Sequence, residues 1–177
     1  EIRLLQHFVE LWCSDYPDVV TGWNVEFFDI QYIVTRIIRE CGEERAKRLS
    51  PWKNIQKRTR EMFDRVQSTY NITGVAIIDY MDAFKKFGYK YGTQESYKLD
   101  HIGYTVLGEK KLDYSEYGSL TALYDQNPQL YLDYNLQDTR LIERLEEETA
   151  LLALVMTMAY SGGVNYVEAF GTVGIWE

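Results

Sequence analysis

The sequence predicts an α/β fold, and three observations support this prediction. Two short runs of apolar, largely β-branched residues, at 18–22 and 74–80, have the composition of strands that are buried on both faces. Segments with apolar residues at helical spacing lie before, between and after these runs. Hydrophobic residues make up 46% of the 177-residue chain, which is enough to bury a sizeable core. Strands that alternate with helices are the pattern of an α/β fold.

The first forty residues contain two predicted helices with a strand between them. Apolar residues at i, i+3 and i+4 predict an amphipathic helix over residues 2–14, and Pro17 ends it. The strand at 18–22 follows, and then the segment GWNVEFFDI at 22–30. Gly42 is the predicted C′ residue of the second helix. The apolar stripe of this second helix consists of Ile30, Ile33, Val34, Ile37, Ile38 and Cys41.

The middle of the chain contains shorter predicted elements. Residues 53–73 lack helical periodicity and favour a hairpin or loop insertion. The strand at 74–80 leads to a helix at about 81–87, and residues 95–123 predict short helices with turns at Gly108 and Gly118.

The last third of the chain predicts one long helix. Asn127-Pro128 marks a break, and from about residue 130 the apolar residues repeat at helical spacing up to Ser161-Gly162-Gly163. The predicted apolar face consists of Leu141, Ile142, Leu145, Leu152, Val155 and Met156.

The charge distribution divides the chain into a basic window and an acidic remainder. The net charge of −8 excludes a uniformly basic nucleic-acid coat. Residues 36–65 nevertheless hold ten Lys and Arg residues against five acids, so this window is +5 and the remainder is −13. The window is a candidate strand-contacting insertion, and a solvated charged surface is an equally good interpretation of it.

Cysteine and histidine give little indication of chemistry. Cys13 and Cys41 lie in apolar helical patterns and are interpreted as small core residues in a reducing compartment. His7 and His101 are isolated from any nucleophile motif, so a serine or cysteine nucleophile has little support. No apolar run has the length of a membrane span, and no signal peptide opens the sequence. Because the sequence begins within a helical pattern, we expect it to be a fragment.

Three groups of carboxylates stand among aromatic and apolar residues. Asp29 follows Asn24 and Phe28 just after a predicted strand, where an N-cap is the favoured structural interpretation. Tyr134 and Asp138 are four residues apart, which places them on one face of a helix. Such a pair can orient a water molecule and hold a metal ion, but a solvated helix face is the favoured structural interpretation.

The third group is the pair Asp79 and Asp82, for which a strand end and a helix cap are the favoured interpretations. Carboxylates of this kind suit hard divalent ions such as Mg²⁺ or Mn²⁺.

Two motifs in order carry a family resemblance. GWNVEFFDI has Asn, three residues, Phe and Asp, and YNLQD at 134–138 has Tyr, three residues and Asp. With the intervening IIDYMDAFKKF and SYKLDHI, the chain resembles the 3′–5′ exonuclease region of family B DNA polymerases of the T-even phage type. The resemblance covers most of the chain.

The resemblance implies a fold and roles for particular residues. The implied fold is RNase H-like, with a mixed sheet, flanking helices and a β-hairpin insertion, and incomplete at its N-terminus here. Asp29 and Asp138 would be metal ligands for two Mg²⁺ or Mn²⁺ ions, and Tyr134 would position the attacking water. Asn24 and Phe28 would hold the substrate strand or shape the site around it. Residues 1–150 would form a partial exonuclease domain, and 151–177 would lead back to the N-terminal domain and towards the palm.

The resemblance also implies partners and a location. These are a single-stranded 3′ end or primer-template DNA, a sliding clamp and other replisome proteins, and the cytoplasm of an infected host cell. The basic stretch at 53–73 falls where relatives carry a hairpin that helps to move the primer end.

One departure from the family pattern affects the expected activity. The family's first motif, Asp-x-Glu, is absent from the 28 residues before Asp29. Because four carboxylates normally hold the two ions, we expect this chain alone to bind metal weakly or not at all and to be inactive as a nuclease.

Two other functions stay open. One is a stand-alone nuclease of the same superfamily, and the other is a degenerate domain that only binds or scaffolds DNA. An exposed sheet edge could also pair with a second copy of the chain, which would make a homodimer.

Overall fold

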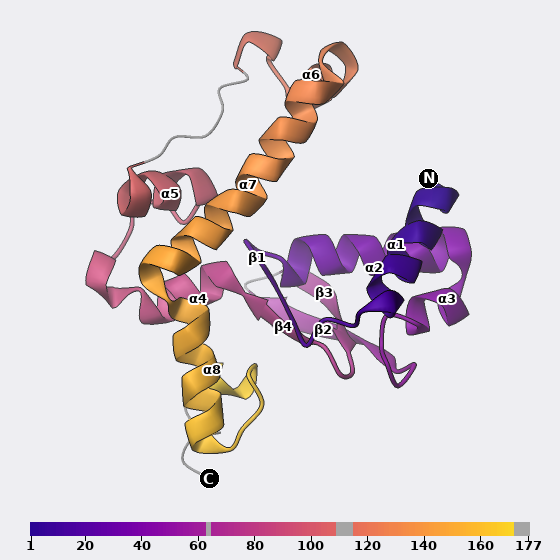
Figure 1. Cartoon of the computed structure of the whole chain (residues 1–177), viewed down its shortest axis with the longest axis horizontal. Helices are drawn as coiled ribbons and strands as arrows, with labels where there is room; N and C mark the ends of the chain where they lie inside the picture. Colours follow the sequence, from indigo (N-terminus) through magenta and orange to yellow (C-terminus); the bar gives the residue numbers. More distant parts are fainter. Residues whose placement is uncertain (63–64, 109–114, 172–177) are drawn as a thin grey trace. The chain divides into compact units, whose positions relative to one another are not determined.

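The computed structural model describes residues 1–62, 65–108 and 115–171, which form two compact units. One unit is Glu1–Asp79 with Ala159–Glu177, and the other is Tyr80–Met158. Figure 1 labels their helices and strands. The tip of the predicted hairpin, at 63–64, and the end of the predicted 151–177 segment lie outside the described residues.

The first unit begins with the helices and the strand that the sequence predicts. Helix α1 is Ile2–Ser14, strand β1 is Val19–Gly22 and helix α2 is Gln31–Cys41, followed by the short helix α3 at Glu43–Lys47. Gly42 ends α2 with φ 87°, and its N–H donates to the Ile38 carbonyl at 3.1 Å. The predicted role of Gly42 is therefore confirmed.

The described strands pair as two small sheets. Strand β4 (Ala76–Asp79) is parallel to β1, with Val19 opposite Ala76 and Gly22 opposite Asp79. Strands β2 (Ile55–Met62) and β3 (Arg65–Ile72) form an antiparallel hairpin, which confirms the hairpin interpretation of the 53–73 stretch. The residues of β1 are half-buried, so the expectation of burial on both faces is wrong for this strand. Among the described strands, β1 pairs with β4 alone.

Apolar side chains from helices and strands form the core of the first unit. It consists of Val9, Val25, Ile30, Val34, Ile37, Ala46, Leu49, Ile72 and Val75. The Trp12 indole donates to the Leu49 carbonyl at 2.8 Å, which ties α1 to the end of the α3 region. Both cysteines are free and half-buried, and the Cys13 thiol donates to the Arg48 carbonyl at 3.3 Å.

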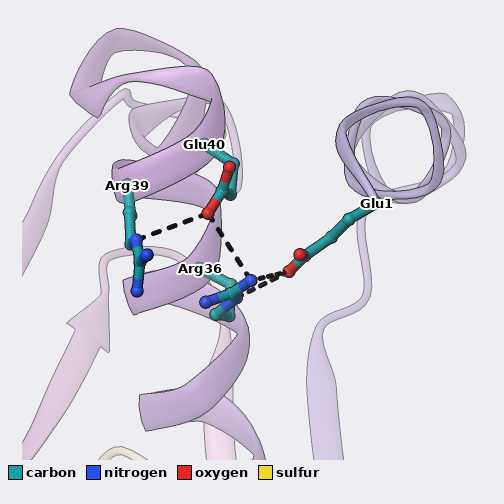
Figure 2. Close-up of polar contacts among 4 residues, drawn as sticks. All are labelled: Glu1, Arg36, Arg39 and Glu40. Atoms are coloured by element: carbon teal, nitrogen blue, oxygen red, sulfur yellow. Dashed lines mark hydrogen bonds and ion pairs between the residues drawn. The ribbon is translucent and has the colours of Figure 1, made fainter.

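An ion-pair cluster joins α1 to α2 on the surface. The Arg36 guanidinium pairs with the Glu1 carboxylate and with Glu40 at 3.5 Å, and Arg39 pairs with Glu40 at 3.4 Å (Figure 2). The hydrogen bond from Arg36 lowers the pKa of the Glu1 carboxyl.

Helices make up most of the second unit. They are α4 (Tyr80–Phe87), α5 (Leu99–Leu107), α6 (Leu120–Gln126), α7 (Pro128–Thr149) and the first part of α8 (Leu151–Gly162). The Asn127 side chain accepts from the Leu130 N–H at 3.1 Å and caps α7, so the predicted break at Asn127-Pro128 is a helix start. Helix α5 packs closely on α7, because a Cβ added at Gly103 would lie 2.8 Å from a methyl carbon of Leu141.

The predicted single long helix is wrong, because the helix breaks at Ala150. Ala150 has left-handed dihedrals (φ 51°, ψ 35°) and ends α7, and its N–H donates to the Glu146 carbonyl at 2.8 Å. The Glu146 carboxylate then accepts from the N–H groups of Leu152 at 2.9 Å and Ala153 at 3.1 Å. Glu146 thus caps the start of α8 from the preceding helix.

None of the helices in the described part of the chain has both the length and the apolar character that a bilayer crossing requires.

Candidate functional site

The first predicted motif forms a tight connection between β1 and α2. Strand β1 ends at Gly22, and the chain then turns through residues 23–25. Asn24 has a left-handed backbone conformation with φ 60°, which asparagine tolerates better than most residues. The turn leads directly into a π-helical segment, Glu26–Ile30, that continues as α2.

Two buried side chains hold this turn through its backbone. Asp79, at the end of β4, accepts from the N–H of Asn24 at 3.0 Å and from the N–H of Glu26 at 3.4 Å. From the hairpin strand β3, the Thr69 hydroxyl donates to the Glu26 carbonyl at 2.6 Å. Asp79 is 5% exposed and Thr69 is 4% exposed.

Asp29 lies inside a helical segment, so the N-cap interpretation is wrong. An N-cap residue precedes the first turn and has non-helical dihedrals. Here the helical dihedrals begin by Val25 (φ −64°, ψ −36°), and the Ile30 N–H donates to the Val25 carbonyl at 3.0 Å. This i to i−5 bond is that of a π-helical turn, a form that is frequent at functional sites.

The surroundings of Asp29 disfavour its charged form. Burial raises the pKa of the Asp29 carboxyl, and a hydrogen bond with its own backbone lowers it by a smaller amount. The neighbouring Phe28 ring is 67% exposed. A half-buried carboxylate thus follows an exposed aromatic residue in the chain.

The second predicted motif lies in α7, within the other compact unit. Tyr134 and Asp138 are both half-buried and one helical turn apart, so the predicted placement on one helix face is confirmed. Leu141 and Leu145, further along α7, are buried and anchor the helix in its unit.

The structure therefore assembles the predicted residues as two groups. Asn24, Phe28 and Asp29 lie on one turn in the first unit, and Tyr134 and Asp138 lie on α7 in the second.

The donor chemistry of these groups fits a hard divalent ion in type but falls short in number. Asp29 and Asp138 offer the oxygen ligands that Mg²⁺ and Mn²⁺ select. In the described ranges, however, no group of three or more His, Cys, Asp or Glu side chains is placed to hold a metal ion.

The pair Asp79 and Asp82 divides into two different roles. Asp79 ends β4, as predicted, but its carboxylate faces the first motif. The prediction that Asp82 caps the next helix is wrong, because β4 runs into α4 without a loop and Asp82 is already its third residue. Asp82 instead pairs with Lys85 at 3.7 Å on the surface. Thr69 was missed by the sequence reasoning, since a threonine in a strand is ordinary.

Comparison with known proteins identifies similar sequences. The family model described as "DNA polymerase family B, exonuclease domain" matches residues 1–102. Over the whole chain, the sequence is 32% identical to the DNA-directed DNA polymerase of Escherichia phage RB69 and 28% identical to that of Enterobacteria phage T4. Over 84% of the chain it is 29% identical to the DNA polymerase delta catalytic subunit of Bos taurus, of which it covers 14%. The chain spans 19% of the length of each phage polymerase.

Proposed function

The chain belongs to the family B DNA polymerases, in the exonuclease domain that these enzymes carry, and we propose that it forms most of the proofreading site of a replicative polymerase. The fold is the mixed α/β arrangement that is consistent with the RNase H-like domain of this family. The observation that carries the proposal is the turn at 22–30. In the segment that follows β1, it carries an exposed ring, Phe28, and a half-buried carboxylate, Asp29, at successive positions.

In the proposed reaction, the chain's residues hold the substrate strand and orient water. Phe28 offers an exposed face on which a base of the 3′-terminal strand can stack, and Asn24 offers an amide for hydrogen bonding. The Tyr134 hydroxyl orients the water that attacks the terminal phosphodiester.

Asp29 and Asp138 would hold divalent ions at this site. Family B exonuclease domains are generally metal dependent. Bound Mg²⁺ or Mn²⁺ would supply an activated water and would stabilise the charge on the leaving 3′ oxygen. The raised pKa of Asp29 is consistent with this role, because a desolvated carboxylate gains most from a nearby cation.

The remaining partners follow from the resemblance and stay predictions. They are primer-template DNA, a sliding clamp and other replisome proteins in the host cell. Dimerisation through the edge of the β1–β4 sheet is likewise a prediction, and a monomeric mass in solution would contradict it.

The proposal is tested with a single-stranded oligonucleotide labelled at its 5′ end, incubated in Mg²⁺ with the polymerase that contains this segment. We expect Asp29→Ala and Asp138→Ala each to slow removal of 3′ nucleotides about a hundredfold or more, since metal ions supply several kcal/mol of transition-state stabilisation. Asp133→Ala is the matched control, because Asp133 is an exposed residue of α7 that accepts a hydrogen bond from Gln129, four residues earlier in the same helix, at 3.0 Å.

Three outcomes would each contradict one part of this reasoning: the role of Asp29, the expected inactivity of the chain alone, or the nuclease function. Equal rates of 3′ nucleotide removal for the Asp29 and Asp133 variants would show that Asp29 is not part of the exonuclease site. Efficient digestion by the 177-residue chain alone, abolished by Asp29→Ala, would show that two of the four family carboxylates suffice. Binding of single strands that weakens steeply with salt, without any hydrolysis by the intact polymerase, would instead favour a DNA-binding scaffold.

A further inference from the structure

Two of the buried polar residues point at the same short stretch of backbone. Among the residues whose burial is described, the buried polar side chains are Ser50, Thr69 and Asp79. The Ser50 hydroxyl donates to the Thr73 carbonyl at 2.6 Å and closes the base of the hairpin region. Thr69 and Asp79 have a different target, since both bond to the turn that carries the first motif.

Glu26 is the point where these two contacts meet. Asp79 accepts from the Glu26 N–H, and Thr69 donates to the Glu26 carbonyl. Both backbone groups of Glu26 are therefore held by side chains from other strands, β4 on one side and β3 on the other. Two residues earlier, the Asn24 N–H also donates to Asp79, and there the backbone is left-handed.

Burial of a carboxylate at this position is unfavourable for folding unless hydrogen bonds compensate it. The N–H groups of Asn24 and Glu26 donate such hydrogen bonds to the Asp79 carboxylate. The arrangement fixes the backbone from which Asn24, Phe28 and Asp29 project, since the π-helical turn begins at Glu26.

We propose that Asp79 and Thr69 are positioning residues of the exonuclease site. They hold residues 24–26 from two sides and thereby set the places of Asn24, Phe28 and Asp29. This inference rests on the proposed function, because it assigns the turn a substrate to which it must be aligned. Displacements of about 1 Å in such a frame can reduce a rate about a hundredfold.

The first test measures the turn itself, without any catalysis. Amide hydrogen exchange is recorded on the full protein for peptides that contain residues 23–29. We expect faster exchange there for Asp79→Asn, since an amide offers one acceptor oxygen where two N–H groups need one each. We expect faster exchange for Thr69→Val as well, and wild-type exchange for Thr69→Ser, which keeps the hydroxyl.

Matched controls separate these effects from general destabilisation. Asp82→Asn makes the same chemical change three residues along the chain, at a surface carboxylate. Thr157→Val removes a hydroxyl that donates within its own helix, to the Ala153 carbonyl at 2.7 Å. Neither control should change exchange in residues 23–29.

The second test measures steady-state exonuclease kinetics of the same variants in the intact polymerase. We expect kcat to fall about tenfold to a hundredfold for Asp79→Asn and Thr69→Val, with a smaller change in KM and with recovery in Thr69→Ser. If a variant were only destabilised, the fraction of active enzyme molecules would fall while kcat per active molecule stayed unchanged. Active-site titration measures that fraction, and the Asp82 and Thr157 variants serve as controls for it.

The outcomes distinguish this inference from the proposed function. A wild-type protein without exonuclease activity would overturn the proposed function. Amide exchange in residues 23–29 would still show whether Asp79 and Thr69 hold the turn. An active wild type with Asp79→Asn and Thr69→Val as fast as their controls would overturn the positioning role alone. If Asp79→Asn fails to fold, the comparison of Thr69→Val with Thr69→Ser decides the inference.

Discussion

Glu146 joins α7 to α8 and gives the sharpest stability prediction. Its carboxylate accepts the N–H groups of Leu152 and Ala153, at 2.9 and 3.1 Å, and the Tyr80 hydroxyl at 3.0 Å. In Glu146→Ala these donors lose their acceptor. Tyr80 keeps a partner, because its hydroxyl lies 2.7 Å from the Thr149 hydroxyl oxygen.

The loss of folding stability expected for Glu146→Ala follows from these contacts. Loss of a helix cap costs about 1 kcal/mol. Loss of the hydrogen bond from buried Tyr80 costs about 1 kcal/mol more. We therefore expect Glu146→Ala to lower the free energy of unfolding by about 2 kcal/mol, which moves the urea midpoint by about 1 M for a slope of about 2 kcal/mol/M.

The assay is urea unfolding followed by circular dichroism, with Glu147→Ala as the matched control. Glu147 is the next residue of α7, is exposed, and should change stability by at most about 0.5 kcal/mol when replaced. Equal midpoints for the two variants would refute the assignment of Glu146 as the cap of α8.

Three further predictions concern Ala150, Asp29 and Arg36. Ala150→Gly should stabilise the chain by about 0.5–1 kcal/mol, because the backbone at this position is left-handed. Ala153→Gly, within α8, should instead destabilise it. Thermal unfolding checks that the two variants shift the melting temperature in opposite directions. Burial raises the pKa of the Asp29 carboxyl in the folded state. The stabilisation by its protonated form is therefore complete below the unfolded-state pKa of roughly 3.9, and it is lost as the pH rises through the folded-state pKa. Asp29→Asn should therefore unfold at a higher temperature than wild type at pH 7, by an amount that shrinks in acid, and equal melting at pH 7 would contradict this. Arg36→Gln should lower the melting temperature at low salt and have less effect in 1 M salt, since its ion pairs with Glu1 and Glu40 lie at the surface; a salt-independent loss would argue for packing instead.

Local patterns in the sequence were sufficient for most of the elements. The stripe from Ile30 to Cys41 predicted α2, and Gly42, with its positive φ, ended it as expected. The alternation of strand and helix, the hairpin at 53–73 and the helix that carries Tyr134 and Asp138 were also predicted correctly. Each of these depends on contacts between residues a few positions apart, which periodicity and turn chemistry report directly.

The same local patterns failed at junctions between elements. The apolar face that spans residues 141–156 is continuous in the sequence, yet Ala150 breaks the helix and Glu146 caps the next one. Asp29 and Asp82 have the residue type of an N-cap, yet both lie within helices that begin earlier. In each case the residue type permits two local structures, and the preceding turn decides between them.

The sequence by itself determined the chemistry that this chain can offer: the two spaced motifs, their carboxylates and aromatic residues, and the helices and strands that carry them. The tertiary structure alone decided how the first motif is held and what its acid experiences. Asp79 meets Asn24 across 55 positions of sequence, and Thr69 meets Glu26 across 43. The burial that raises the pKa of Asp29 likewise depends on the packed unit. Contacts over such separations arise only when strands pair and a core forms, so no local pattern encodes them.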